Sequence, residues 1–318
     1  MINPKWDLKM MVEVAKMYHK DNMTQERISK ELGISRSTIS LILSEAKEYG
    51  IIEINIKDPF TNKLHLAEQL KMEFDLEDCI VIPTSISSIP LLTRIVASQA
   101  VLAAEQYLKS HTSIGIAWGL TCYEFMRSMR NEKNIKDVEV VPLIGGSSNV
   151  SSEYQLNEIV RIFAEKMQGT PSFIYAPATV QTTADKELYM QSLYMRSIVE
   201  KWKNLDIAIV SAGAPPEYYS TQQIILPDEA LHLYTNDQGR PVGDICARQF
   251  NIQGEFLQNE HNEKVMGINE KSLRNAGKVM CIAAGAHKVM SILGVLRTGI
   301  IHYFVTDENT ANEVLHLL

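Results

Sequence analysis

Several features are scarce or missing in this 318-residue sequence, and each absence excludes a class of protein. Only four cysteines are present, Cys79, Cys122, Cys246 and Cys281, and no two of them form a Cys-x-x-Cys pair. Each lies among small or apolar residues, so we expect reduced thiols in a core rather than a zinc site or a redox motif. We therefore expect no metal site and no cofactor.

Long apolar runs are also missing. Glycine, proline or charged residues interrupt every apolar stretch well short of about 18 residues, the length that a membrane-spanning helix needs. The N-terminus does not resemble a signal peptide, because Lys5, Asp7, Lys9 and Glu13 interrupt any apolar core. The sequence therefore predicts a cytoplasmic protein.

The chain has no excess of positive charge, since its formal net charge is −7. This value argues at first against a nucleic-acid partner. Residues 1–60, however, contain nine Lys and Arg against nine Asp and Glu, so the acidity lies in the remainder. A neutral segment binds DNA only weakly by itself, even when a few cations face the phosphates. Dimerisation or higher assembly is then needed for useful affinity.

The pattern of residues 23–50 is typical of a helix-turn-helix. Thr24 is a suitable N-cap, Ile28 and Leu32 lie four apart on one face, and Gly33 supplies the positive φ that ends a helix. Ser35 caps the next helix, in which Ile39, Ile42, Leu43 and Ala46 recur at helical spacing. The opposite, polar face is what a recognition helix presents to a major groove. The predicted DNA-binding residues are Thr24, Ser35, Arg36, Ser37, Thr38 and Ser40.

The flanking segments favour a DNA-binding unit over an ordinary helical hairpin. An apolar first helix is predicted from Leu8 to Tyr18, and Ile52, Ile54 and Ile56 alternate with polar residues as in a wing strand. After Asp58-Pro59, residues 61–74 read as a linker helix with an apolar seam of Leu66, Leu70 and Phe74. That seam fits a dimer contact or packing on a larger domain equally well.

From Asp78 onward, short apolar runs alternate with amphipathic segments, which predicts a mostly parallel, doubly wound sheet with helices on both faces. We expect strands at 79–83, 113–118, 138–144, 172–176, 207–212, 279–284 and 301–305. We expect helices near 91–109, 121–131, 153–168, 186–202, 287–297 and 308–317. Residues 214–278 break this rhythm and are treated as a partly irregular insertion.

In such a sheet, ligands bind beyond the carboxyl ends of the strands. Gly119, Leu120 and Thr121 follow one predicted strand and begin a helix, where N–H groups and a hydroxyl favour an anion such as phosphate. The same pattern also fits a tight turn with a cap. Gly145 and Gly146 follow another strand and allow close approach of a ligand to the backbone.

Two charged residues stand near these predicted loops. Lys288 begins a helix after the strand at 279–284, where its charge suits a phosphate, although most lysines are simply solvated. Asp244 offers acceptor oxygens to sugar hydroxyls, with a helix cap or an ion pair as the alternative role.

Motifs across both halves of the chain resemble those of the SorC type of sugar-binding transcriptional regulator. They are the helix-turn-helix with SIGIAWGLT, VVPLIGG, NEIVRIFAEKMQGTPSFIYAPA, IAIVSAGA, PVGDIC and KVMCIAAGAHK followed by ILGVLRTGIIHYFVTDENTANEVL. The resemblance implies three segments: a winged helix-turn-helix at 1–57, a linker or dimerisation helix at 58–75, and an effector and oligomerisation domain at 76–318. It also implies that the effector domain is similar to glucosamine-6-phosphate deaminase and ribose-5-phosphate isomerase, and that tetramers bind operator DNA.

The family's site residues map onto single positions of this sequence. Its phosphate loop falls on Gly119, Leu120 and Thr121, and its phosphate-contacting lysine on Lys288. Its hydroxyl-binding acid falls on Asp244 with Ile245 beside it, and its glycine pair on Gly145 and Gly146. One branch of the family places a Schiff-base lysine just before this pair, where the present chain has Ile144, which disfavours covalent capture.

The expected function is a DNA-binding regulator of a carbohydrate-utilisation operon, controlled by a phosphorylated sugar and not an enzyme. The alternative is a sugar-phosphate isomerase or deaminase with an appended DNA-binding segment. Such an enzyme needs an acid and a base over the sugar, for which Asp244 and His287 are the only obvious pair.

Overall fold

The structure is a computed structural model that describes most of the chain: residues 6–52, 63–84, 86, 88–131, 135–147, 154–216, 218, 234, 237 and 239–318. The chain divides into two compact units, Met1–Lys57 and Asp58–Leu318. Each unit has its own apolar core.

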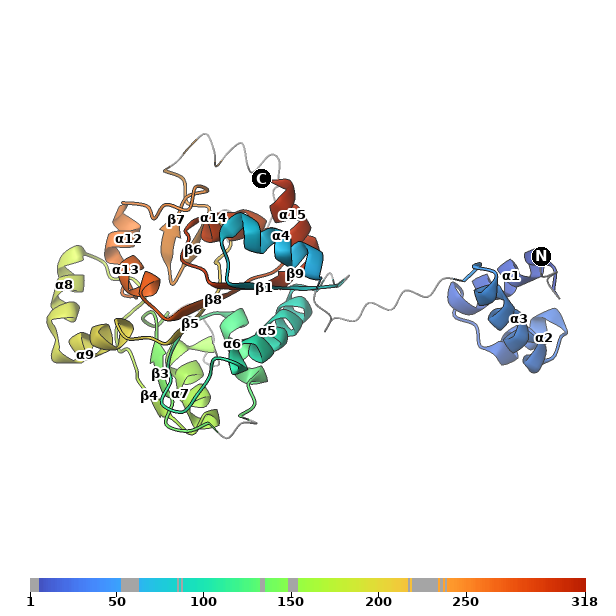
Figure 1. Cartoon of the computed structure of the whole chain (residues 1–318), viewed down its shortest axis with the longest axis horizontal. Helices are drawn as coiled ribbons and strands as arrows, with labels where there is room; N and C mark the ends of the chain where they lie inside the picture. Colours follow the sequence, from blue (N-terminus) through green and yellow to red (C-terminus); the bar gives the residue numbers. More distant parts are fainter. Residues whose placement is uncertain are drawn as a thin grey trace. The chain divides into compact units, whose positions relative to one another are not determined.

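Three helices form the N-terminal unit: α1 (Leu8–His19), α2 (Gln25–Leu32) and α3 (Arg36–Glu48), shown in blue in Figure 1. The apolar stripes expected from the sequence meet in one core, so these helices are confirmed. The buried residues of this core are Met11, Val14, Ile28, Ile39, Ile42, Leu43 and Ala46. The predicted wing residues Ile54 and Ile56 lie outside the described residues.

Gly33 ends α2 in the left-handed conformation, with φ of 68°, and makes the turn into α3. We expect Gly33→Ala to destabilise this unit by about 1 kcal/mol, because a Cβ is unfavourable in this conformation. Nothing lies within 4 Å of the added Cβ, so the effect comes from backbone strain alone. Hydrogen exchange measures it: amides of α2 and α3 should exchange about fivefold faster, whereas those of the larger unit should not change.

The larger unit contains a seven-stranded, fully parallel sheet in the order β1-β9-β8-β5-β2-β3-β4. The central strands β5 and β9 are buried along their whole length, as expected for a sheet with helices on both faces. The strands are β1 (Asp78–Ile82), β2 (Ser113–Ile116), β3 (Glu139–Pro142), β4 (Thr170–Pro171), β5 (Ile207–Val210), β8 (Lys278–Ile282) and β9 (Tyr303–Asp307). The predicted doubly wound α/β fold is confirmed.

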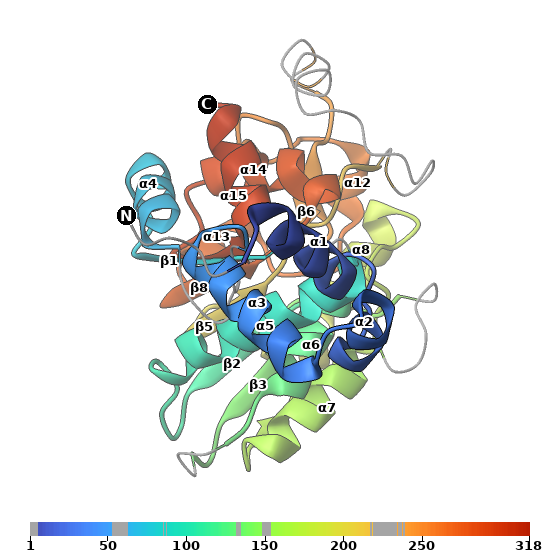
Figure 2. The ribbon, with the colours of Figure 1, turned by 90° about the vertical axis from the view of Figure 1, so that its right-hand side faces the viewer.

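Helices cover both faces of this sheet (Figures 1 and 2). One layer contains α5 (Ile89–Glu105), α6 (Leu120–Ser128) and α7 (Leu156–Lys166), which pack side by side. The other contains α4 (Leu64–Phe74), α14 (Val289–Arg297), which follows the short 3₁₀ helix η2 (Ala286–Lys288), and α15 (Glu308–His316). This arrangement leaves the carboxyl ends of the strands free to carry loops.

The helix α4 lies where the linker helix was predicted, and it packs on its own unit. Ala67, Leu70 and Phe74 are buried in the core of the larger unit, against β1 and α15. The apolar seam is therefore occupied within the chain. The sequence allowed either a dimer contact or packing on the larger domain for this seam, and the structure shows packing on the larger domain.

The strand predicted at 172–176 is wrong, because β4 covers only Thr170 and Pro171. Asn157 of α7 supplies the reason. Its side-chain amide donates to the Ile174 carbonyl and its oxygen accepts the Ile174 N–H, both at 3.0 Å. These bonds satisfy the backbone that a longer edge strand would have paired with β3.

The single helix predicted at 186–202 is two helices, α8 (Thr183–Gln191) and α9 (Leu193–Trp202). Ser192 separates them in an extended conformation, and its hydroxyl accepts the Met195 N–H at 3.2 Å as the N-cap of α9. Within its described residues, the region predicted as a partly irregular insertion contains the short elements β6 (Gly243–Ile245), β7 (Arg248–Phe250), α12 (Glu260–Lys264) and α13 (Glu270–Arg274).

Candidate functional site

The first turn of α3 presents a polar, exposed surface. The Ser35 hydroxyl accepts the Thr38 N–H at 3.1 Å and lies 2.7 Å from the Ser37 hydroxyl. Arg36, Ser37 and Ser40 are exposed, whereas Ile39 on the opposite side is buried. The cap thus holds a row of hydroxyls and one guanidinium at the end of the helix that contacts base edges in helix-turn-helix proteins.

Residues before α2 extend this polar surface. Thr24 caps α2 by accepting the Arg27 N–H at 3.3 Å. A polar hollow of about 670 Å³ lies between this turn and Arg36, lined also by Tyr18, His19, Asn22, Met23, Gln25 and Glu26. The sequence analysis did not single out His19, Asn22 or Gln25, because only the packing of α1 on α3 brings them beside Arg36.

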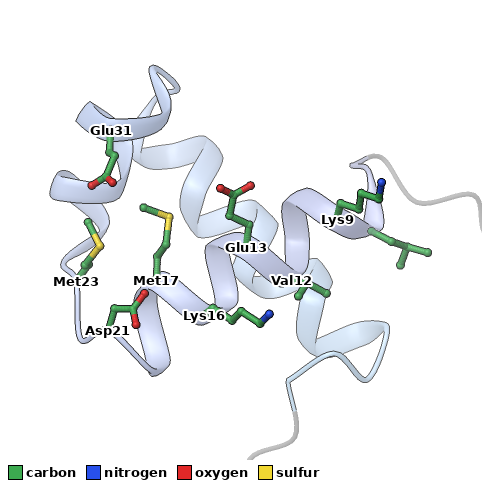
Figure 3. Close-up of a pocket in the computed structure, with 9 residues that line it drawn as sticks. Lys9, Val12, Glu13, Lys16, Met17, Asp21, Met23 and Glu31 are labelled. Carbon is green, nitrogen blue, oxygen red and sulfur yellow. The ribbon is translucent and has the colours of Figure 1, made fainter.

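A second hollow in this unit, of about 630 Å³, follows α1 (Figure 3). Its lining combines apolar and charged side chains: Leu8, Lys9, Val12, Glu13, Lys16, Met17, Asp21, Met23 and Glu31. No residue of α3 lines it, so it is separate from the polar surface around Arg36.

The larger unit has one place where the strand order reverses. From β2 the chain continues to β3 and β4 on one side, whereas β5 leads to β8 and β9 on the other. The loops that follow β2 and β5 therefore diverge between neighbouring strands, which is where ligands bind in open parallel sheets.

Gly119 follows β2 at this reversal and begins α6 with φ of 103°. No side chain among the described residues caps the helix, so the N–H groups of its first turn, including those of Leu120 and Thr121, lack a capping side chain there. Uncapped N–H groups with the positive end of the helix dipole favour an anion. This loop was predicted from the sequence as a phosphate site.

Lys288 joins the loops after β8 and β5. Its ammonium donates to the hydroxyl of Ser211, which follows β5, at 3.3 Å. The side chain is half-buried, and burial lowers the pKa of Lys288, while Cys281, Cys122 and Asp244 oppose that shift. Cys122 lies in the first turn of α6, where burial raises the pKa of its thiol and the nearby Lys288 opposes that shift.

Asp244 lies on β6, near the same ammonium. Its Oδ2 accepts the Ala247 N–H at 3.0 Å, and its backbone carbonyl accepts the Gly213 N–H at 2.8 Å. Burial raises the pKa of Asp244 overall, and the Ala247 N–H and the nearby Lys288 oppose part of that shift. A Cβ on Gly213 would overlap the Asp244 carboxylate, so the lack of a side chain at this position leaves room for the carboxylate. Half-buried groups of opposite charge thus lie together beside the β5 loop.

Three other predicted site residues, Ile245, Gly145 and Gly146, contact mainly other protein atoms. Ile245 is buried in the core, so only its backbone is available to a ligand. The Gly145 N–H donates to the Met266 carbonyl at 2.8 Å and the Gly146 N–H to the Ala176 carbonyl at 2.9 Å. A Cβ on Gly145 would overlap the carbonyls of Ala176 and Pro177. The glycine pair therefore permits close packing of backbone on backbone.

The loop before Lys288 is held by residues that the sequence analysis missed. The Gly285 N–H donates to Thr310 Oγ1 at 2.7 Å and to Asp307 Oδ2 at 3.2 Å. Asp307 also caps α15, which was the local signal that could have identified it.

Asp244 and His287, considered as the acid and base of an enzyme, have different surroundings. No hydrogen bond or ion pair between Asp244 and His287 is found in the described part of the chain. Instead His287 stacks on Tyr218, with ring centroids 4.8 Å apart. Burial, reinforced by the charge of Lys288, lowers the pKa of His287 to about 4, so its imidazole is neutral at physiological pH.

The described residues contain neither a metal-binding cluster nor a helix that could span a membrane. No cluster of three or more His, Cys, Asp or Glu side chains there could hold a metal ion. Likewise, none of the helices in these parts of the chain is long and apolar enough to cross a membrane.

Comparison with known proteins identifies the family of this chain. The profile of Sugar-bind, a sugar-binding domain family, matches residues 58–316. The sorbitol operon regulator of Klebsiella pneumoniae is 29% identical over 97% of this chain and 98% of its own length. The deoxyribonucleoside regulator of Bacillus subtilis is 27% identical over 96% of each chain.

Solved structures of transcriptional regulators have a similar fold. The crystal structure of the full-length Klebsiella pneumoniae sorbitol operon regulator SorC superposes with a TM-score of 0.68, at 28% identity, over 98% of this chain and 99% of the other. A transcriptional regulator from Streptococcus pneumoniae superposes with a TM-score of 0.69, at 26% identity, over 80% of this chain and 96% of the other. The chain is therefore a transcriptional regulator that belongs to the SorC type of sugar-binding regulators.

Proposed function

We propose that the N-terminal unit binds operator DNA of a carbohydrate-utilisation operon and that a phosphorylated sugar, bound by the larger unit, controls this binding. The proposed DNA contacts are Thr24, Ser35, Arg36, Ser37, Thr38 and Ser40. Two relatives are named for sorbitol and deoxyribonucleosides, which supports a sugar-derived effector. A regulator that reads operator DNA works in the cytoplasm.

The observation that carries the phosphate assignment is the meeting of two anion-binding elements at the strand reversal. Lys288 lies between the ends of β8 and β5, and it is near enough to Cys122, in the first turn of the uncapped helix α6, to oppose the rise in the pKa of that buried thiol. A dianionic phosphate would compensate a desolvated ammonium and at the same time accept the N–H groups of Leu120 and Thr121.

Asp244 supplies the sugar-recognition part of the proposal. Its carboxylate is half-buried next to Lys288 and accepts one backbone N–H at Oδ2, so its remaining lone pairs suit sugar hydroxyls. Gly145, Gly146 and the backbone of Ile245 would complete the wall of the site.

Replacing Asp244 with Asn tests this role. We expect Asp244→Asn to weaken sugar-phosphate binding by at least about tenfold, because hydrogen bonds to a charged group contribute roughly 1.5–3 kcal/mol. The unliganded chain should not lose thermal stability, since burial raises the Asp244 pKa and the ionised carboxylate is unfavourable in the fold above that pKa. Calorimetric titration measures the affinity, and Asp75→Asn, at an exposed position that ends α4, is the matched control.

We further propose that the effector is bound without being converted and that the chain acts as a dimer or tetramer. The two relatives named above are regulators, which supports binding without conversion. A neutral DNA-binding unit also needs more than one copy to hold an operator at physiological salt.

A thermal-shift screen tests the sensor. Pentose, hexose and polyol phosphates are each compared with the unphosphorylated parent and with inorganic phosphate. A ligand at a hundredfold excess over Kd stabilises the native state by about 2.7 kcal/mol, which is several degrees in Tm. A shift with one phosphorylated member alone supports the site, whereas equal shifts with the unphosphorylated parent would exclude a phosphate-dependent sensor.

A further inference from the structure

The helix α8 and the start of α9 carry an unusual amount of exposed apolar surface. Leu188, Tyr189, Leu193, Tyr194 and Tyr175, here called the α8–α9 patch, are between 39% and 84% exposed. Tyr175 and Tyr194 pack on one another with centroids 5.6 Å apart. None of the nine residues of α8 is buried. Figure 1 shows α8 at the left margin of the larger unit, away from the sheet.

Polar contacts and one partly buried apolar side chain, Met190, hold α8 in place. Thr182 and Asp185 form a capping box at its start, and the Lys186 ammonium donates to the Glu263 carbonyl at 2.7 Å. A helix of this length is marginal in water unless a face of it is buried. A partner that covers the exposed face of α8 would therefore stabilise this helix.

The exposed area of the patch approaches the area that each partner buries in a protein interface. With about 200 Å² for each fully exposed side chain of this size, the patch exposes roughly 600 Å². That equals the upper end of the largest apolar patches on monomers, about 300–600 Å². It also approaches the roughly 800 Å² that each partner buries in a standard interface.

The balance of charge around the patch limits which class of partner can bind it. Asp185 and Glu187 are balanced by Lys186 and Arg196 within residues 183–196. A neutral apolar surface with tyrosines fits a second neutral apolar surface, whereas DNA or an anionic membrane would require an excess of cations. We propose that the α8–α9 patch is an interface with the same patch on a second copy of this chain, which gives the self-association proposed above a specific surface.

Sedimentation velocity of the full chain tests this interface. We expect Leu193→Glu, and Leu188→Glu separately, to halve the mass of the parent assembly at micromolar concentration and to raise the dissociation constant at least a hundredfold. Both residues are exposed, so the fold of the chain should be kept. Leu102→Glu is the matched control: Leu102 lies on α5, outside the patch, and is 62% exposed. Its variant should keep the mass of the parent.

Hydrogen exchange gives an independent readout. Because no residue of α8 is buried within the chain, its amides should be protected only in the assembled state, and dilution or Leu193→Glu should remove that protection. An unchanged mass for both patch variants would overturn the proposal, as would a halved mass for Leu102→Glu alone or a monomeric parent.

Neither measurement uses DNA or a sugar, so their outcome is independent of the regulator function. If the mass changes as expected and no duplex or sugar phosphate binds, the interface stands and the proposed function fails. If DNA and sugar phosphate bind but the patch variants keep the parent mass, the function stands and this interface is wrong.

Discussion

Lys288→Met should abolish the response to a phosphorylated sugar. The methionine keeps most of the volume of the lysine stem but removes the charge that lies between the β8 and β5 loops. Truncating one partner of a buried charge pair weakens binding by about 2–5 kcal/mol, which is at least thirtyfold in Kd. The thermal shift caused by the sugar phosphate should disappear at concentrations that stabilise the parent.

The stability of the unliganded chain separates this effect from misfolding. Because burial lowers the Lys288 pKa, the folded state disfavours the protonated ammonium, and that cost is present at every pH below the folded pKa. Lys288→Met removes the cost, so its Tm without ligand should equal or exceed that of the parent. Lys271→Met, at an exposed lysine of α13, should leave both Tm and response unchanged. A variant that still responds to the sugar phosphate would refute the assignment of Lys288.

Sugar-phosphate affinity should also depend on pH in a definite direction. As pH rises through the lowered Lys288 pKa, the free chain loses the ammonium and with it the attraction for phosphate. The decline should begin at lower pH than for a lysine at its ordinary value of 10.5. Calorimetric titrations from neutral to alkaline pH measure this decline, and Lys288→Met should show none of it.

Arg36→Ala should remove specific DNA binding while effector binding stays intact. Arg36 is exposed at the start of α3, next to the hydroxyls of Ser35 and Ser37. A good contact from arginine to a base contributes about 1–3 kcal/mol, and an assembly on a two-fold operator loses it twice. We expect at least about thirtyfold weaker binding and a smaller dependence of affinity on salt.

Lys47→Ala is the control for the charge lost with Arg36. Lys47 lies in the last turn of the same helix and is also exposed, but it is three turns away from the proposed reading end. Fluorescence anisotropy with an operator duplex selected from a random library measures both variants. Loss of binding in Lys47→Ala but not in Arg36→Ala would place the reading surface at the other end of α3.

Local chemistry made the N-terminal unit predictable from its sequence. Gly33 and Ser35 act only on neighbouring residues, through a left-handed backbone and a cap, and both have the predicted roles. The central strands were equally visible, because β5 and β8 are almost fully buried and rich in Ile and Val. Such features depend on few residues outside their own segment.

Contacts between distant segments could not be predicted. Asn157 ends β4 early through its bonds to Ile174, which only the fold brings close. Ser211 was missed for the same reason, since its bond to Lys288 depends on β5 and β8 being neighbours. Gly145 and Gly146 were predicted to allow close approach of a ligand to the backbone, and in the fold their N–H groups donate to protein carbonyls. Sequence thus indicated which loops to inspect but not how their donors are used.

The most direct test of a sugar-controlled regulator is the affinity of the full chain for its selected operator duplex, measured by anisotropy with and without sugar phosphates. A coupling free energy of about 1–3 kcal/mol is typical of allosteric control, which is a change of roughly 5- to 150-fold in Kd. We predict a change of at least fivefold with one phosphorylated sugar and none with its unphosphorylated parent or inorganic phosphate. An operator affinity that no member of the panel alters, or that the unphosphorylated sugar alters equally, would contradict control by a phosphorylated sugar.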